Sequence, residues 1–273
     1  MPTRFSPAGA CIYCGAAMYH PTSSRPLADE HIIPFGLNGD LILPESTCQA
    51  CERMTGQFEA VVLRGSLLGC RSLLGLQTRR PKDRPKALPL FDTSFTPEKK
   101  YMIPIEDYPI SLLLMQLDGP PILSGGTTNN RQIKVWSKVF RLDADKLARK
   151  YGITSFATPA LDSFSFIRTI AKIGYSFAVA HLGIGAFRPL LTDLIFGREN
   201  PHSTPFVGGI FDDVHSSSNL HDISINIMSI ASIKYVVVHV RLFSHWGTPV
   251  YVVVVGESPN QLIWKMRPVV TNA

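Results

Sequence analysis

Two pairs of cysteines in the first quarter of the chain are well suited to bind a metal ion. Cys11 and Cys14 form one C-x-x-C pair, and Cys48 and Cys51 form a second. Four thiolates spaced in this way can surround one tetrahedral Zn²⁺ ion, which stabilises small folds that lack a large core. The alternative is a set of buried or redox-active cysteines, although two such pairs rarely arise together. The spacing therefore predicts a structural zinc site.

A segment that joins acids to a histidine lies between the two cysteine pairs. It reads DEHIIP and covers residues 29–34. Together with CIYC before it, and with the turn GLNG and the segment CQACERMTG after it, this segment resembles the HNH endonuclease family. The resemblance is closest to members whose zinc knuckles flank a β-hairpin and a helix, and it covers about residues 11–65.

The resemblance implies a ββα-metal site for nucleic-acid hydrolysis. At the matching positions, His31 would be the general base that activates water, and Glu30 would bind a catalytic Mg²⁺ or Mn²⁺ ion. A neutral imidazole can accept a proton near pH 7, and carboxylate oxygens suit a hard cation that offsets charge on the phosphate. Glu52 occupies the position after the second cysteine pair where the family often has Asn or His. Glu59, on a similar helical face, is the fallback ligand.

The family's middle asparagine, which orients the histidine, has no clear counterpart. Asn38 lies in the glycine-containing turn and is better explained as a turn residue that tolerates positive φ. The alternative for His31 is a purely structural role at the end of a strand. Asp29 could equally well hold a metal ligand in place or be a solvated acid. We predict catalysis by His31, with its orienting partner unassigned.

Short elements must hold these residues in place. Residues 28–34 mix acidic and β-branched residues and stop at proline, which predicts a short strand and a turn. Residues 41–43 can form the returning strand. Ser46 or Thr47 is the candidate N-cap of a helix that continues to about residue 75, weakened at Gly65.

A basic, proline-rich segment follows this helix. Residues 77–90 contain three prolines, five basic residues and one acid, which predicts an extended cationic connector. We place a nuclease module at residues 1–76, a linker at 77–100 and a mixed α+β domain at 101–273. Basic side chains here could contact phosphates without reading sequence, or could simply be solvated. These candidates are Arg64, Arg71, Arg79, Arg80, Lys82, Arg84 and Lys86.

The C-terminal two thirds carries no comparable motif, and its histidines lack a ligand spacing. Residues 162–182 predict a long helix. Arg168, Lys172 and Tyr175 form a stripe on it that could grip a phosphate or a partner, but a polar helix face is the favoured interpretation. The remaining predicted elements are strands at 101–105, 110–117 and 132–140, a helix at 143–151, and a β-hairpin at 235–243 and 250–255.

Composition indicates a folded protein. The 273 residues are 45% hydrophobic and 18% charged, which excludes a disordered chain, and the net charge of +6 favours a polyanionic partner only weakly. Two uncharged runs, 173–187 and 242–256, are shorter than the roughly 18 to 20 residues that span a bilayer. The first ten residues are too short and polar for a signal peptide, so we expect a cytoplasmic protein without membrane association.

These observations predict an α+β protein with an N-terminal zinc-bound ββα-metal module and a mixed C-terminal domain. The C-terminal domain would position substrate, bind a protein partner or effector, or regulate cleavage. The predicted activity is metal-dependent hydrolysis of phosphodiester bonds, with DNA preferred. Two alternatives stay open: a non-catalytic zinc module that binds nucleic acid or protein, and a nuclease of the same kind that acts on RNA.

Overall fold

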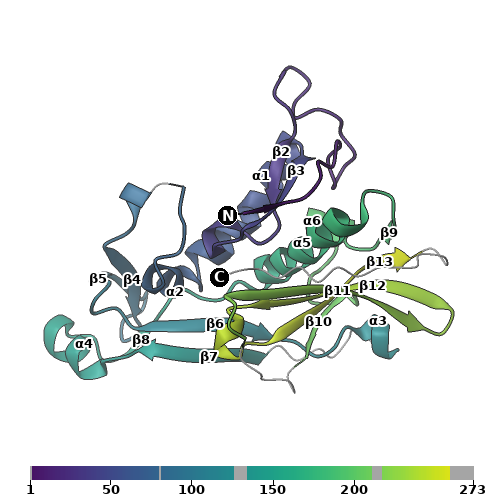
Figure 1. Cartoon of the computed structure of the whole chain (residues 1–273). Helices are drawn as coiled ribbons and strands as arrows, with labels where there is room; N and C mark the ends of the chain where they lie inside the picture. The colour runs from purple at the N-terminus through teal and green to yellow at the C-terminus, as the bar shows by residue number, and fades with distance from the viewer. Residues whose placement is uncertain (1, 80, 126–133, 211–216, 259–273) are drawn as a thin grey trace.

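The structure combines small β-sheets with packed helices (Figure 1), and it is a computed structural model that describes residues 2–79, 81–125, 134–210 and 217–258. The α+β class predicted from the sequence is confirmed. Within these ranges, no helix is both long enough and apolar enough to cross a membrane.

A three-stranded sheet opens the chain. Its strands, in spatial order, are β1 (Thr3–Arg4), β3 (Leu41–Thr47) and β2 (Ala28–His31). β2 and β3 are antiparallel, with Glu30 opposite Leu43 and His31 opposite Ile42. The predicted strand, turn and returning strand are therefore confirmed.

The turn between β2 and β3 requires its small residues. It contains the short 3₁₀ helix η1 (Phe35–Leu37), and Asn38 follows with φ of 60°. This positive φ confirms the interpretation of Asn38 as a turn residue, and its side-chain oxygen accepts a hydrogen bond from the backbone N–H of Gln77 at 2.6 Å. A Cβ atom on Gly39 would lie 1.9 Å from the carbonyl oxygen of Ile33, so only glycine fits there.

The predicted helix follows as expected, but the predicted N-cap is wrong, because β3 continues through Thr47, which pairs with Ala28. Cys48 is the N-cap residue and makes no side-chain capping bond. The Ser46 hydroxyl instead donates to the carbonyl of Leu43, and the Thr47 hydroxyl donates to the carboxylate of Glu30. Both hydroxyls therefore bond to residues of β2 and β3 and do not cap the helix. The helical region is also broken near Gly65 into α1 (Gln49–Arg64) and α2 (Leu68–Leu73).

Two small sheets form the middle of the chain. One has the order β5-β4-β8, and the other pairs β6 with β7. Residues 87–90, predicted to be part of an extended connector, lie in β4, where Leu88 and Leu90 are buried. That part of the connector prediction is wrong, because alternate side chains enter a local core. The elements here are η2 (Pro81–Asp83), β4 (Ala87–Asp92), β5 (Lys99–Pro104), β6 (Ile110–Gln116), α3 (Pro121–Ser124), β7 (Lys134–Arg141), α4 (Ala144–Tyr151) and β8 (Phe156–Ala157).

The C-terminal part is an antiparallel sheet covered by the helix α5 (Ser163–Leu182). Its strands follow the order β10-β13-β12-β11, with β9 beside β13, and the predicted hairpin is the β12–β13 pair. Helix α5 packs closely on it, since a Cβ on Gly174 would lie 2.8 Å from Val253. The other elements are β9 (Arg188–Pro189), α6 (Thr192–Phe196), β10 (Val207–Ile210), β11 (His221–Ile230), β12 (Ile233–Leu242), η4 (Ser244–Trp246) and β13 (Val250–Ser258).

Helix α5 lies between the N-terminal unit and the C-terminal sheet (Figure 1). Every residue from Phe166 to Val179 except Arg168 is buried, and one hydrophobic core runs from the N-terminal unit through α5 to β12 and β13. The favoured interpretation of Lys172 and Tyr175 as part of a polar helix face is therefore wrong, because both are buried and α5 has protein on both sides. The division of the chain at residues 77–100 stays a prediction.

Candidate functional site

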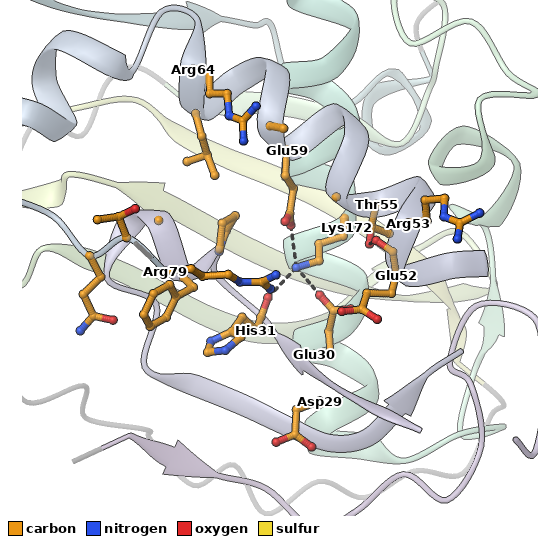
Figure 2. A pocket seen from close by; sticks show the side chains of 18 of the residues that line it. Asp29, Glu30, His31, Glu52, Arg53, Thr55, Glu59, Arg64, Arg79 and Lys172 are labelled. Carbon is orange, nitrogen blue, oxygen red and sulfur yellow. Dashed lines mark hydrogen bonds and ion pairs between the residues drawn. The ribbon is translucent and has the colours of Figure 1, made fainter. Parts of the chain in front are cut away.

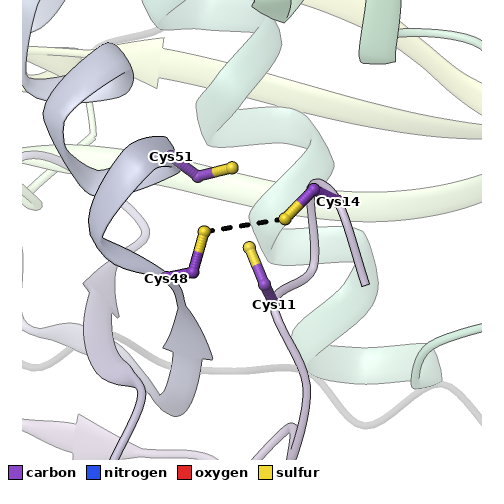
Figure 3. Close-up of side chains that lie close together, drawn as sticks. All are labelled: Cys11, Cys14, Cys48 and Cys51. Atoms are coloured by element: carbon purple, nitrogen blue, oxygen red, sulfur yellow. Dashed lines mark hydrogen bonds between the residues drawn. The ribbon is translucent and has the colours of Figure 1, made fainter. Parts of the chain in front are cut away.

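The four cysteines of the two C-x-x-C pairs meet at one point (Figure 3). Their Sγ atoms all lie within 4.8 Å of one another, and those of Cys14 and Cys48 are 3.6 Å apart. The first pair lies on a tight turn in which Gly15 has φ of 78° and donates its N–H to the carbonyl of Cys11 at 2.8 Å. The second pair lies at the start of α1. This donor set fits a tetrahedral Zn²⁺ ion, as the spacing predicted.

The thiols influence one another's protonation. A hydrogen bond from Cys51 lowers the pKa of Cys11 to about 4, against the opposing effect of burial. The same contact raises the pKa of Cys51. The cluster therefore holds a thiolate at neutral pH, which is the form of cysteine that binds zinc.

A pocket of about 570 Å³ lies between β2, α1 and the segment after α2 (Figure 2). The structure brings most of the predicted site residues into this one pocket. It is lined by Asp29, Glu30, His31, Glu52, Glu59, Arg64, Arg71 and Arg79 from the prediction, and also by Tyr19, Arg53 and Lys172. Lys82 and Lys86 line neither this pocket nor the neighbouring one, and Arg80 lies outside the described residues.

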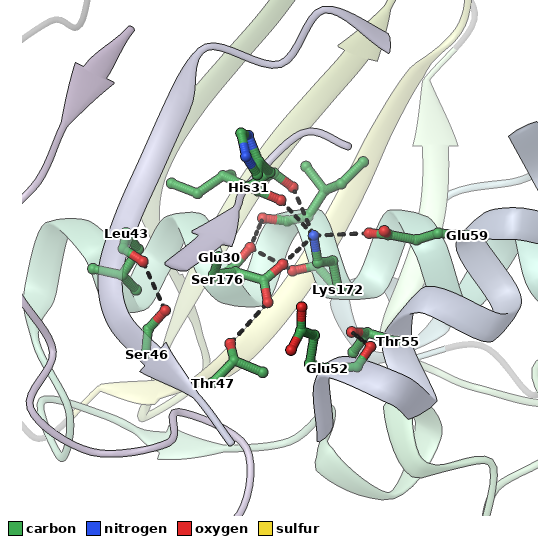
Figure 4. Close-up of polar contacts among 12 residues, drawn as sticks. Glu30, His31, Leu43, Ser46, Thr47, Glu52, Thr55, Glu59, Lys172 and Ser176 are labelled. Atoms are coloured by element: carbon green, nitrogen blue, oxygen red, sulfur yellow. Dashed lines mark hydrogen bonds and ion pairs between the residues drawn. The ribbon is translucent and has the colours of Figure 1, made fainter. Parts of the chain in front are cut away.

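Lys172 of α5 lies at the centre of the acidic part of the pocket (Figures 2 and 4). Its Nζ atom forms ion pairs with Oε1 of Glu30 and, at 2.8 Å, with Oε1 of Glu59. Nζ also donates to the backbone carbonyl of His31 at 2.5 Å. The lysine side chain is 1% exposed. Burial alone would lower the pKa of Lys172, but the two carboxylates outweigh it and raise that pKa, so the ammonium form persists.

The two carboxylates that hold Lys172 differ in their surroundings. Glu30 is buried on β2, and its second oxygen accepts a hydrogen bond from the Thr47 hydroxyl at 3.0 Å. Glu59 comes from the third turn of α1, and burial raises its pKa although Lys172 opposes that effect. Both predicted ligands therefore have a protein cation as their partner.

His31 is half-buried at the end of β2, with its ring edge-on to Phe35 at a centroid distance of 5.3 Å. Burial lowers the pKa of His31, and the positive charges of Lys172 and Arg79 add to this effect, whereas a hydrogen bond with the Gly39 backbone and the charge of Glu30 oppose it. Within the described part of the chain, its Nδ1 atom is buried without a hydrogen-bond partner. The imidazole is thus neutral at pH 7 and able to accept a proton.

Glu52 lies in the first turn of α1 and accepts a hydrogen bond from the Tyr19 hydroxyl at 2.8 Å. Figure 4 shows its carboxylate beside that of Glu30. The cysteine cluster is nevertheless the single group of three or more suitable ligands that lies close enough to hold an ion among the described residues. Because Lys172 is already bound between Glu30 and Glu59, the donor set does not fit the predicted Mg²⁺ or Mn²⁺ ion as it stands.

Arginines give the pocket its positive side. Arg71 donates to the carbonyls of Gly36 at 2.6 Å and of Leu63 at 2.8 Å, so it fixes the turn after β2 against α1. A second pocket, of about 710 Å³, adjoins the first and shares Arg64, Arg71 and Arg79 with it. None of its lining residues is acidic, and the arginines of both pockets make no ion pair with the described carboxylates.

Arg84 lines the second pocket and also has a structural role. Its guanidinium donates to the carbonyls of Gly75 and Leu76 at 2.8 and 2.7 Å, which ties the loop after α2 in place. Because the two pockets share Arg64, Arg71 and Arg79, arginine side chains continue from the pocket of His31 into the second one.

Comparisons with protein-family models, with curated proteins and with solved structures found no match to this chain. The resemblance to the HNH family therefore rests on the motif residues of the sequence alone.

Proposed function

We propose that this protein hydrolyses phosphodiester bonds in nucleic acid, with DNA the preferred substrate and His31 the general base. The observation that carries the proposal is the shared pocket: His31 lines it together with Arg53, Arg64 and Arg79, none of which is paired with a described carboxylate. A base beside unpaired cations is the combination that phosphodiester hydrolysis needs. The motif around residues 29–34 supports the same conclusion.

The chain's own residues supply the steps. His31 accepts a proton from water, the water oxygen forms a bond to phosphorus, and the bond from phosphorus to the leaving oxygen breaks. The leaving oxygen takes a proton from solvent. Arg53, Arg64 and Arg79 bind the phosphate oxygens and offset the charge that develops on them.

In this proposal zinc has a structural role, and no step requires a catalytic cation. A Zn²⁺ ion held by the four cysteines would fix the turn at residues 11–15 to the start of α1, and so would position β2. A Mg²⁺ or Mn²⁺ ion would offset charge on the phosphate, as the sequence predicts. Since Glu30 and Glu59 hold Lys172, no step above depends on that ion.

Cleavage of supercoiled plasmid and of single-stranded RNA by wild type and His31→Ala tests the proposal, with Mg²⁺, Mn²⁺ or EDTA and with bound zinc measured. We expect DNA cleavage that falls by about 100-fold or more in His31→Ala. Arg149→Ala is a matched control, because Arg149 lies on α4 and lines neither of the two pockets. Cleavage of RNA alone would correct the substrate, and no cleavage by wild type would refute the activity.

A second candidate is a zinc module that binds nucleic acid or a protein without cleaving it. The engagement of Glu30 by Lys172 and Thr47 favours this alternative, because it removes the predicted metal ligand. It predicts that wild type and His31→Ala bind an oligonucleotide equally well in fluorescence anisotropy, and that neither cleaves it.

A further inference from the structure

The surroundings of the Lys172 ammonium are those of a bound metal cation. Among the described residues, its neighbouring oxygens are one from each carboxylate of Glu30 and Glu59 and the backbone carbonyls of His31 and Ile32, the last at 3.4 Å. Carboxylate and carbonyl oxygens are the ligands that hard divalent cations prefer in proteins. A single side chain thus occupies an all-oxygen shell that could otherwise hold an ion.

Helix α5 is anchored so that the lysine reaches this shell. One turn before Lys172, the Arg168 guanidinium lies 4.5 Å from the centre of the Phe58 ring and donates to the carbonyl of Ile195. One turn after it, the Tyr175 hydroxyl donates to the carbonyl of Ile12 at 2.7 Å. Contacts on both sides of Lys172 therefore fix α5 against the N-terminal unit.

The charge balance of the shell also favours a resident cation. Two carboxylates placed together at low exposure would repel each other and lose hydration, so they need a compensating positive charge. Lys172 supplies it from within the chain. A divalent ion could enter between Glu30 and Glu59 only by displacing the lysine, whose side chain lines the pocket but is only 1% exposed.

We propose that Lys172 is the resident cation of this site, so that phosphodiester hydrolysis here requires no free divalent cation. The inference rests on the proposed function and concerns which cation balances the carboxylates of Glu30 and Glu59. Because the ammonium group is enclosed, Lys172 is a positioning residue: it acts through Glu30 and through the carbonyl of His31, which it holds beside the pocket. Glu30 and Glu59 are then partners of the lysine and not ligands of a catalytic ion.

Manganese binding tests the inference without any measurement of activity. Electron paramagnetic resonance would count bound Mn²⁺ in zinc-loaded wild type, Lys172→Gln, and Lys172→Gln combined with Glu30→Gln. We expect no stoichiometric Mn²⁺ in wild type, one ion per chain in Lys172→Gln, and loss of that ion in the double variant. A wild type that binds one Mn²⁺ and loses it in Glu30→Gln would overturn the inference, and this arm needs no lysine variant to fold.

Cleavage kinetics give the second test. With retained zinc confirmed, wild type should cleave at the same rate in EDTA and in Mg²⁺, to within about twofold. Lys172→Gln should lose about 100-fold in kcat in EDTA and recover part of it with Mn²⁺, whereas Lys172→Arg should keep most activity in EDTA. A wild type that retains its zinc but stops cleaving in EDTA would contradict the inference. If wild type cleaves nothing, the proposed function fails, while the Mn²⁺ measurement still decides whether Lys172 is the resident cation.

Discussion

The cluster of four cysteines and the Lys172 cluster are assembled in opposite ways. The four cysteines come from residues 11–51 of the N-terminal unit, and three of them are buried. The Lys172 cluster joins oxygens of β2 and α1 to a cation from α5, which is more than 100 residues away along the chain. The cysteine cluster joins segments that are close in the sequence. The Lys172 cluster forms only when both halves of the chain are folded together. The two clusters should therefore respond differently to mutation.

The largest effect is expected from a substitution in the cluster of four cysteines. Cys51→Ser should abolish zinc binding and unfold the N-terminal unit, because structural zinc contributes about 10 to 16 kcal/mol in small zinc modules. Zinc content and thermal unfolding followed by circular dichroism would check this. The buried Cys70 lies outside the cluster, so Cys70→Ala should keep the zinc and cost about 1 to 2 kcal/mol. A Cys51→Ser protein that melts like wild type would show that the cysteines are not a structural staple.

The Lys172 cluster should come next. Lys172→Met leaves Glu30 and Glu59 without their cation, which should lower the free energy of unfolding by about 3 to 5 kcal/mol while zinc stays bound. Adding Glu30→Gln and Glu59→Gln to Lys172→Met should restore part of the loss, because the uncompensated charges are removed. Urea unfolding of the single and triple variants would measure both values. A triple variant less stable than Lys172→Met would contradict the charge argument.

This contrast also explains what the sequence could predict. Some features depend only on residues that are close together in the sequence, and these were found as predicted. They are the grouping of the four cysteines, the strand and turn around His31, and helix α5. The N-cap at Ser46 or Thr47 was wrong because β3 extends by pairing Thr47 with Ala28, and that pairing depends on a strand some twenty residues earlier. Local capping preferences contain no information about it.

The role of Lys172 was missed for a related reason. A stripe with Arg168 and Tyr175 looks like an exposed helix face if the helix covers only one layer, but α5 lies between two. A signal was present in the neighbouring residues: Ile170, Ala171, Ile173 and Gly174 surround Lys172 with small or apolar side chains. A lysine in such a run must either be neutral or find buried acids. Glu59 of α1, which the sequence suggested only as a fallback metal ligand, was a candidate partner.

A histidine contact between the two halves gives a smaller, pH-dependent effect. His221 of β11 donates from Nε2 to the Leu37 carbonyl at 2.6 Å, and its Nδ1 accepts from the Phe243 N–H at 3.1 Å. Burial lowers its pKa to about 4, with His245 adding to this, and with the Leu37 hydrogen bond and Asp222 opposing it. The unfolded chain then takes up the proton first as pH falls, so stability should be full above about pH 7 and decline toward pH 4.

The expected loss from His221 is about 2 kcal/mol at pH 5 relative to pH 8. Urea unfolding of wild type and His221→Gln at both pH values would isolate it, since the variant lacks the titrating group and should show a smaller decline. Equal declines in the two proteins would mean that other groups control the acid response.

The smallest effect should come from a single hydrogen bond at the other end of the same interface. Tyr175→Phe removes the hydroxyl that donates to the Ile12 carbonyl but keeps the ring that packs against Phe187 and Tyr13, so it should cost about 1 kcal/mol. Combining it with Lys172→Met in a double-mutant cycle would measure their coupling. If both side chains act by docking α5, the combined loss should be smaller than the sum, because undocking by one removes the contact of the other. Strict additivity would instead mean that the lysine cluster and the Tyr175 contact stabilise the two halves independently.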